Sequence, residues 1–184
     1  MKVLVTCGPT WVPIDAVRVI SNRSTGEMGR LISGYLKKAG AKVTLLEGPM
    51  SFDEFAEKFK AACAKKYDIV VHAAAVSDFR PKGIKGKLRS GRTLNLSLVP
   101  TEKLINAVKR LSPGTFLVGF KLGSSLGQAM KDAKRLFMDA GCDLVVANST
   151  GYGYGGRIID AHGRILAEAA DKNGIARSLV RLLK

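Results

Sequence analysis

Apolar residues along the chain alternate between short continuous runs and longer stripes with three- and four-residue spacing. The continuous runs predict buried strands at 2–6, 43–46, 68–75, 116–120 and 144–147. Between the first two runs lies a helical stripe of Met28, Leu31, Ile32, Tyr35, Leu36 and Ala39, and Gly40 follows where a helix would end. Further stripes predict helices near 52–63, 101–111 and 126–137. Because strands that alternate with helices build parallel sheets covered on both faces, we predict an α/β fold. It is a single domain, residues 1–184, with a doubly wound, Rossmann-like, mostly parallel sheet.

Two stretches depart from this alternation. Residues 80–92 are basic and rich in glycine, and Leu94, Leu96 and Leu98 then alternate with polar residues. We predict a basic flap that lies over a ligand, followed by an amphipathic strand. Residues 157–166 predict a C-terminal hairpin that turns at His162 and Gly163, with a closing helix from about Asp171.

Composition narrows the class of protein. The chain has 184 residues and 46% hydrophobic content, enough to bury a core without disulfides or structural metals. Its three cysteines are widely spaced, which predicts neither a disulfide framework nor a zinc site. No export signal is apparent, and no apolar run approaches the roughly 20 residues of a membrane span. We therefore expect a cytoplasmic protein without a membrane partner.

Charge adds a second constraint. The 30 Lys and Arg residues against 15 Asp and Glu give a net charge of +15, which attracts phosphates, nucleic acid or acidic lipids. A nucleic-acid-binding module would need aromatic residues within the basic run at 80–92, and that run has none. An NAD(P)-dependent Rossmann oxidoreductase would carry GxGxxG directly after the first strand, and this sequence does not. Both remain alternatives to a phosphate-handling enzyme.

The residues that follow the predicted strands are the candidates for chemistry, because ligands of open α/β sheets bind at the carboxyl ends of the strands. Ser24, Thr25 and Gly26 precede a helix, where they would cradle an anion or simply cap the helix. Small residues at 73–75 lead to Asp78, which would hold Mg²⁺ between phosphates or cap a turn. The spacing of these residues does not decide between ligand binding and capping.

Four segments, in this order and at these intervals, resemble the phosphopantothenoylcysteine synthetases. They are GPTWVPIDAVRVISNRSTGEMG at 8–29, HAAAVSDFRPK at 72–82, GFKL at 119–122 and DLVVANS at 143–149. The resemblance implies a ligase that activates the carboxylate of 4'-phosphopantothenate with CTP or ATP and Mg²⁺, and then transfers the acyl group to the amine of cysteine. It implies no protein nucleophile. Nucleic acid is not among the implied partners.

The resemblance also assigns roles to residues. Asn22 matches the asparagine that contacts the acyl intermediate, and a lysine of the following loop, Lys82 or Lys85, would serve the phosphates. The implied phosphopantothenate contacts are Arg18, Ser24, Thr25, Gly26 and Ala75. The implied nucleotide contacts are His72, Ala73, Ala74, Asp78, Glu102, Lys103, Leu104, Ile105 and Phe120, with Asp78 also the metal ligand.

Departures from the family pattern leave some points open. Leu136 and Ala140 stand where fused bacterial members carry two nucleotide-contacting lysines, whereas Phe120, Lys121 and Leu122 are similar to the ATP-preferring animal enzyme. The choice between CTP and ATP is therefore undecided. The bacterial family members are usually fused to a flavin-dependent decarboxylase, and this chain begins at the synthetase strand. The resemblance thus implies no bound FMN, a separate decarboxylase and a homodimer.

Overall fold

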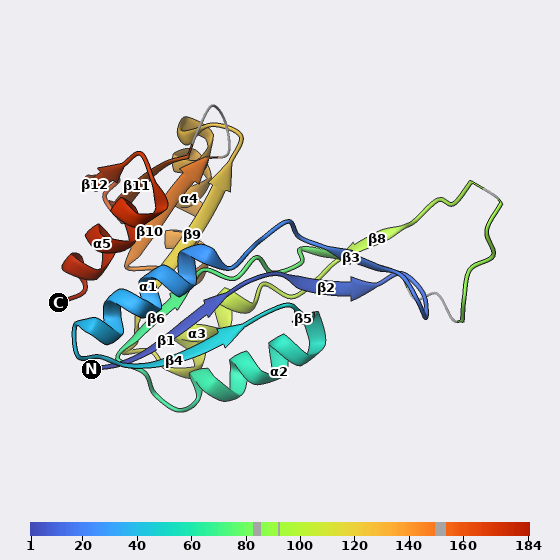
Figure 1. Ribbon diagram of the computed structural model, residues 1–184, viewed down its shortest axis with the longest axis horizontal. Coiled ribbons are helices and arrows are strands. Elements are labelled where there is room, and N and C mark those ends of the chain that lie inside the picture. The colour runs from blue at the N-terminus through green and yellow to red at the C-terminus, as the bar shows by residue number, and fades with distance from the viewer. Residues whose placement is uncertain (83–85, 92, 150–153) are drawn as a thin grey trace.

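The computed structural model describes residues 1–82, 86–91, 93–149 and 154–184. Within them, the central sheet has the strand order β12-β11-β10-β9-β6-β1-β4 (Figure 1). Its parallel strands are β1 (Lys2–Cys7), β4 (Lys42–Glu47), β6 (Ile69–His72), β9 (Phe116–Gly123) and β10 (Leu144–Ser149). The antiparallel hairpin β11 (Gly155–Asp160) and β12 (Ile165–Ala169) completes one edge. The prediction of a Rossmann-like, mostly parallel sheet is confirmed.

Helices cover both faces of this sheet. On one face, α1 (Glu27–Lys38) and α5 (Lys172–Leu182) bury Ile32, Leu36 and Leu179 against the strands. On the other face, α2 (Phe52–Cys63) buries Phe55 and Phe59, and this side also holds η1 (Leu104–Asn106), α3 (Ala107–Leu111) and α4 (Leu126–Ala140). The predicted helix at 101–111 is thus divided and begins three residues later, as a 3₁₀ turn. Among the described residues, no helix has the length and apolar composition needed to cross a membrane.

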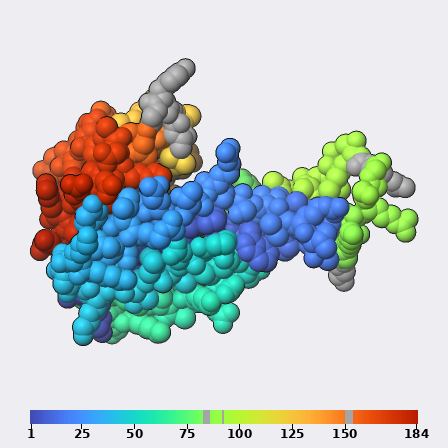
Figure 2. All heavy atoms as spheres, in the orientation of Figure 1, coloured from blue at the N-terminus to red at the C-terminus, as the bar shows by residue number. Residues whose placement is uncertain are grey.

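An arm, which we define as residues 10–21 together with residues 79–82, 86–91 and 93–100, projects from this body (Figures 1 and 2). It contains β2 (Thr10–Pro13) and β3 (Val19–Ser21), which are inserted between β1 and α1, and β2 also pairs with β5 (Met50–Ser51). The rest of the arm carries β7 (Phe79–Pro81), paired with β8 (Leu98–Pro100). The long segment between β1 and α1 is therefore not an irregular loop, because it forms the paired strands β2 and β3.

The structure corrects the predicted strand at Leu94, Leu96 and Leu98. Only Leu98 lies in a strand, where it is opposite Pro81. An alternating apolar face forms a strand when it packs on a partner, and Leu94 is 49% exposed. By contrast, the predicted C-terminal hairpin is confirmed, with Gly163 at φ 78° in its turn, and Asp171 caps α5 by accepting from the Gly174 N–H at 2.7 Å.

Candidate active site

The topology itself points to one place on the molecule. After β1 the chain builds β4 on one side and then crosses back to place β6, β9 and β10 on the other side. The order of the sheet therefore reverses between β1 and β6. In open α/β sheets this reversal opens a crevice at the carboxyl ends of the two strands, which is where ligands bind. Here those ends are followed by Gly8 and by residues 73–75.

Backbone hydrogen bonds hold the two strand ends together beyond the sheet. The Ala75 N–H donates to the Gly8 carbonyl at 2.9 Å, and the Thr10 N–H donates to the Ala75 carbonyl at 3.1 Å. The Ala74 N–H donates to the Thr6 hydroxyl at 3.3 Å. The result is a strip of small, half-exposed residues, 73–75, that presents main chain at the rim of the sheet.

The side chain of His72 faces away from this rim. Its ring lies 4.8 Å from the ring of Phe59, centroid to centroid, and its Nδ1 is 2.9 Å from the Thr6 hydroxyl. Burial lowers the pKa of His72 to about 4, so the imidazole is neutral at physiological pH. A contact from His72 to a nucleotide at the rim would therefore use its main chain.

Asn22 arrives at the rim from the other direction. Strand β3 returns the arm to the body, and the Asn22 Nδ2 donates to the Ala75 carbonyl at 2.9 Å, although the two residues are 53 positions apart. The Asn22 side chain remains exposed. The structure thus brings together Asn22, which the resemblance assigns to the acyl intermediate, and Ala75, which it assigns to phosphopantothenate.

Helix α1 starts directly at the carboxyl end of β1. Gly26, with φ 74°, is the N-cap, and a Cβ there would lie 3.2 Å from the Gly8 nitrogen. A Cβ on Gly29 would lie 2.3 Å from the Cys7 Cβ, so only glycine allows this approach of helix to strand. The Ser24 and Thr25 hydroxyls accept from the N–H groups of Gly26 and Glu27 at 3.4 Å, which is the long limit of hydrogen bonding. The first turn of α1 therefore faces the rim with weakly capped amides.

Asp78 follows the rim strip at the base of the arm. Its carboxylate is 60% exposed and forms an ion pair with the Lys103 Nζ at 2.5 Å. Its main-chain carbonyl accepts from the Thr101 N–H at 3.0 Å. Asp78 therefore brings a cation from the segment before η1 to the same side of the site. Among the described residues, no group of three or more His, Cys, Asp or Glu side chains could hold a metal ion.

The remaining predicted nucleotide contacts differ in where their side chains lie. The Glu102 carboxylate pairs with the Lys60 Nζ at 2.6 Å and so turns toward α2. Leu104 and Ile105 are buried in the core. Phe120 is half-buried on β9, packed against the core on the α1 and α5 face. From residues 102–105, the Lys103 side chain is thus the one that reaches Asp78.

Two of the predicted cations, Arg18 and Lys82, belong to the arm. Arg18 lies in the turn between β2 and β3, where it pairs with Asp15 and donates to the Leu88 carbonyl at 3.3 Å. Lys82 lies just beyond β7, where its N–H donates to the Ser97 carbonyl at 2.9 Å. Lys85 lies outside the described residues.

The sequence analysis did not single out two residues whose side chains have shifted pKa values, Asp15 in the arm and Tyr154 before β11. The buried Asp15 carboxylate accepts from the Val17 and Leu88 N–H groups, at 2.9 and 3.0 Å, and its pKa is lowered to about 2, chiefly by the Val17 bond. The spacing of Asp15 and Arg18, suited to a local ion pair, was the available signal. Burial raises the pKa of Tyr154 to about 12, and its hydroxyl, near the Asn148 side chain, makes no hydrogen bond within the described residues. No sequence pattern marked Tyr154.

Comparison with known proteins identifies the family to which the chain belongs. A family model described as the DNA/pantothenate metabolism flavoprotein C-terminal domain matches residues 1–184. Over 165 residues the chain is 42% identical to the coenzyme A biosynthesis bifunctional protein CoaBC of Thermococcus kodakarensis, a match that covers 80% of the chain and 41% of that relative. The CoaBC protein of Escherichia coli is 30% identical over 167 residues, with the same coverage. The chain thus spans about two fifths of the length of these relatives.

Solved structures share the fold. The DNA/pantothenate metabolism flavoprotein of Streptococcus pneumoniae superposes with a TM-score of 0.85 at 23% identity, covering 100% of this chain and 98% of that one. A mutant of Cab2 in complex with phosphopantothenate-cysteine gives a TM-score of 0.82 at 17% identity, covering 98% and 85% of the two chains. The shared architecture spans the whole sheet.

Proposed function

The chain belongs to the family of DNA/pantothenate metabolism flavoprotein C-terminal domains, and on that basis we propose that it is a phosphopantothenate–cysteine ligase. The reaction would join 4'-phosphopantothenate to L-cysteine at the expense of CTP or ATP. Two kinds of relative support this proposal: those named for coenzyme A biosynthesis, and a protein of the same fold that holds phosphopantothenate-cysteine. The product would be the substrate of a flavin-dependent decarboxylase.

The observation that carries the proposal is the position of Asn22. An exposed carboxamide, whose Nδ2 donates to the Ala75 carbonyl at 2.9 Å, lies beyond the carboxyl ends of β1 and β6, where the order of the sheet reverses. Its amide can donate to a developing negative charge, and a donor fixed beforehand stabilises such a charge without reorganising. Asn22 is therefore suited to contact an acyl-nucleotide during attack by an amine.

The first turn of α1 supports a place for the phosphate of phosphopantothenate. Its N-cap, Gly26, supplies no side-chain cap, and the Ser24 and Thr25 hydroxyls bond only weakly to the local amides. Free amides at a helix start, together with the helix dipole, attract anions. We assign Ser24, Thr25 and Gly26 to this role.

The nucleotide would lie along residues 73–75, with its phosphates toward Asp78 and Lys103. The small side chains of the strip let a base or a phosphate chain approach the main chain. Mg²⁺ is commonly held by one or two carboxylates plus substrate phosphates, so the single exposed carboxylate of Asp78 fits that ion. When bound, the ion would neutralise phosphate charge, and Lys103 would then exchange its carboxylate partner for a phosphate oxygen.

The chemistry proceeds in two displacements. A carboxylate oxygen of 4'-phosphopantothenate attacks the α-phosphorus of the triphosphate, and pyrophosphate leaves. The cysteine amine then attacks the acyl carbon, and the nucleoside monophosphate leaves as the amide forms. Both steps depend on alignment and on charge neutralisation, which main-chain amides, Asn22 and Lys103 can supply without a protein nucleophile.

We also infer a homodimer in which the arm of one protomer completes the site of its partner. Within one protomer, Arg18 is held in the β2–β3 turn of the arm by Asp15 and Leu88, and Lys82 lies beyond β7. These cations would serve phosphates only at a site that the arm can reach. A partner protomer offers such a site.

The assignment is tested by incubating the purified protein with 4'-phosphopantothenate, L-cysteine and Mg²⁺, and with each of the four nucleoside triphosphates in turn. We expect continuous pyrophosphate release that depends on cysteine, and formation of 4'-phosphopantothenoylcysteine in equal amount. Comparing CTP with ATP gives the nucleotide preference. If no triphosphate supports release, the proposal is wrong.

A further inference from the structure

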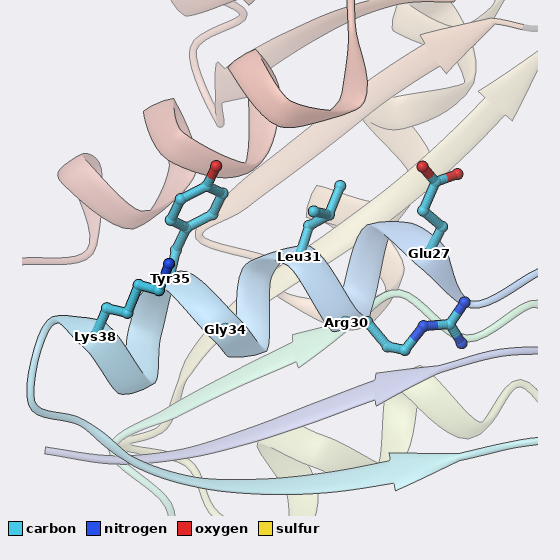
Figure 3. Close-up of a pocket in the computed structure, with 6 residues that line it drawn as sticks. All are labelled: Glu27, Arg30, Leu31, Gly34, Tyr35 and Lys38. Atoms are coloured by element: carbon cyan, nitrogen blue, oxygen red, sulfur yellow. The ribbon is translucent and has the colours of Figure 1, made fainter.

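A groove runs along the outer side of α1 and continues onto α5, on the helical face rather than at the strand ends. Its first cavity, of about 300 Å³, is lined from Glu27 to Lys38 along one side of α1 (Figure 3). At 1.5 Å per residue this stretch is about 16 Å long. A second cavity of about 240 Å³ shares Tyr35 and Lys38 with the first and extends to Arg177, Arg181 and Lys184. The two form one elongated trough, which we call the α1–α5 groove.

The middle of the groove is hollow because of one residue. Gly34 is exposed in the interior of α1, and a Cβ built on it meets nothing within 4 Å. Figure 3 shows Leu31 and Tyr35 on the side of the helix toward α5 and Arg30 leaving it on another side, with no side chain at Gly34 between them. Glycine destabilises a helix interior relative to alanine, and here neither a positive φ nor close packing requires it. Its effect is to leave room for something that approaches α1.

The rim of the groove is basic. Lys38, Arg177, Arg181 and Lys184 have no ion-pair partner among the described residues, whereas the acid at the groove, Glu27, is neutralised by Lys172. Arg177 also donates to the Tyr35 hydroxyl at 3.2 Å, and its guanidinium lies 5.9 Å from the ring centroid. These contacts keep Tyr35 down in the groove.

The floor is apolar and lies below the charges. Leu31 and Tyr35 are half-buried, and Val180 is 5% exposed. Leu31, Tyr35 and Val180 lie below the charged rim, whereas side chains that insert into a lipid bilayer protrude from the surface. A recessed apolar floor between basic rims matches a polypeptide helix with an apolar stripe and acidic flanks.

We propose that the α1–α5 groove is a docking site for an acidic amphipathic helix of another polypeptide. Apolar side chains of that helix would lie over Gly34 against Leu31 and Tyr35. Its carboxylates would pair with Lys38, Arg177 and Arg181. The site is separate from the strand ends at which we place the ligase reaction.

The test uses a fluorescent synthetic peptide of about 15 residues, made of Leu, Ala and Glu with leucines on one helical face. A control peptide has the same composition in shuffled order. Binding is measured by anisotropy at physiological ionic strength, where bulk attraction to a protein of charge +15 is screened beyond about 8 Å. Gly34→Leu fills the hollow without changing charge, and Arg181→Glu reverses one rim charge. Lys131→Glu, an exposed change on α4 at the opposite face, is the matched control.

We expect the amphipathic peptide to bind the native protein more tightly than the shuffled one, with affinity reduced roughly tenfold or more by Gly34→Leu and by Arg181→Glu but not by Lys131→Glu. If the two peptides bind equally, or if Gly34→Leu leaves the affinity for the amphipathic peptide unchanged, binding is due to unspecific charge attraction and the proposal is wrong. Tighter binding of oligo-dT or of phosphatidylglycerol vesicles through the same residues would overturn its assignment to a polypeptide. Circular dichroism of each variant confirms that the fold is intact.

Discussion

The imidazole of His72 lies between the central sheet and α2, where it contacts Phe59 and bonds to the Thr6 hydroxyl. The resemblance implied a nucleotide contact for His72, and because side chains alternate along a strand, its ring turns into the core and leaves only its main chain for such a contact. The pattern of apolar residues placed the strand correctly. It could not tell which face a histidine at its end would take, because that depends on the exact register of β6 against β1.

Burial of His72 predicts a pH dependence of stability. Its pKa falls from 6.5 to about 4 on folding, so the unfolded chain binds the extra proton between these values. Stability should therefore decrease as pH falls from about 7 toward 4, by up to about 3 kcal/mol at 1.36 kcal/mol per pKa unit. Urea unfolding at pH 7 and pH 4.5 measures the decrease.

The matched variant for this measurement is His72→Leu, because the Thr6 hydroxyl keeps its bond from the Ala74 N–H. The variant should lose most of the pH-dependent part of stability and keep its nucleotide affinity. A variant with unchanged pH dependence would show that another group is responsible.

Asn22 allows a sharper test of the proposed mechanism. Asn22→Asp replaces the Nδ2 donor with an acceptor that faces the Ala75 carbonyl and, in the proposed complex, a phosphate. Loss of one preorganised donor typically lowers turnover by about a hundredfold or more. Because triphosphate binding and the first displacement would persist, quenched reactions containing cysteine should accumulate 4'-phosphopantothenoyl-nucleotide, detected by mass spectrometry.

Asn173→Asp serves as the control, since Asn173 is an exposed amide that bonds to Tyr35 on the α5 side. It should turn over normally. If Asn22→Asp also remains within about threefold of the native rate, Asn22 has no role in transfer and the donor argument fails.

At the scale of elements, α1 carries two glycines with opposite requirements. A Cβ at Gly29 would lie 2.3 Å from the Cys7 Cβ, whereas a Cβ at Gly34 would meet open space. Gly29→Ala should therefore destabilise the protein by about 1–3 kcal/mol, since α1 must move off the sheet. Gly34→Ala should stabilise it by up to about 1 kcal/mol through helix propensity alone. Urea unfolding at neutral pH measures the free energy of unfolding of both variants. Equal changes in this free energy would contradict the packing of α1 on β1.

The Asp15 carboxylate joins the two parts of the arm by hydrogen bonds. One oxygen accepts from the Val17 and Arg18 N–H groups, and the other accepts from the Leu88 N–H and pairs with Arg18. Asp15→Asn can keep the first set of bonds but turns a donor toward Leu88. We expect faster hydrogen exchange at Leu88 and at Ala16, whose N–H donates to the Gly86 carbonyl. Unchanged exchange at both positions would show that the two parts of the arm are held together by other contacts.

The elements also show where sequence reasoning succeeds and where it ends. The stripes and runs predicted the buried strands and helices of the body because each buries one face in a shared core. They did not predict β2, β3, β5, β7 and β8, which are short and take their partners from distant segments. The close approaches of Gly26 to Gly8 and of Gly29 to Cys7 were not predicted either, because the segment that carries β2 and β3 separates these residues in the sequence. Long-range pairing of this kind leaves no local pattern.

At the scale of the whole molecule, the arm leaves large apolar side chains exposed to solvent in a single protomer. It projects from the body (Figure 2) and exposes large apolar side chains. Val17 is 63% exposed, Val19 51%, Phe79 53% and Leu98 45%. Apolar side chains gathered on one projection are typical of a protein interface. We therefore expect this face to be covered by a second protomer in solution.

The prediction is that the protein sediments as a dimer and that Val19→Lys combined with Phe79→Lys converts it to a monomer, because two charges would be buried without partners at the interface. Met138→Lys is the matched control: Met138 is 83% exposed, but it lies on α4, away from the arm. If the arm also brings Arg18 and Lys82 to the partner's site, the monomeric variant should lose ligase turnover in parallel with its dimerisation, whereas the control keeps both. A native protein that is monomeric at assay concentrations and fully active would overturn both the interface and the shared site, and it would require the phosphates to be served by Lys103 and the main chain of a single protomer.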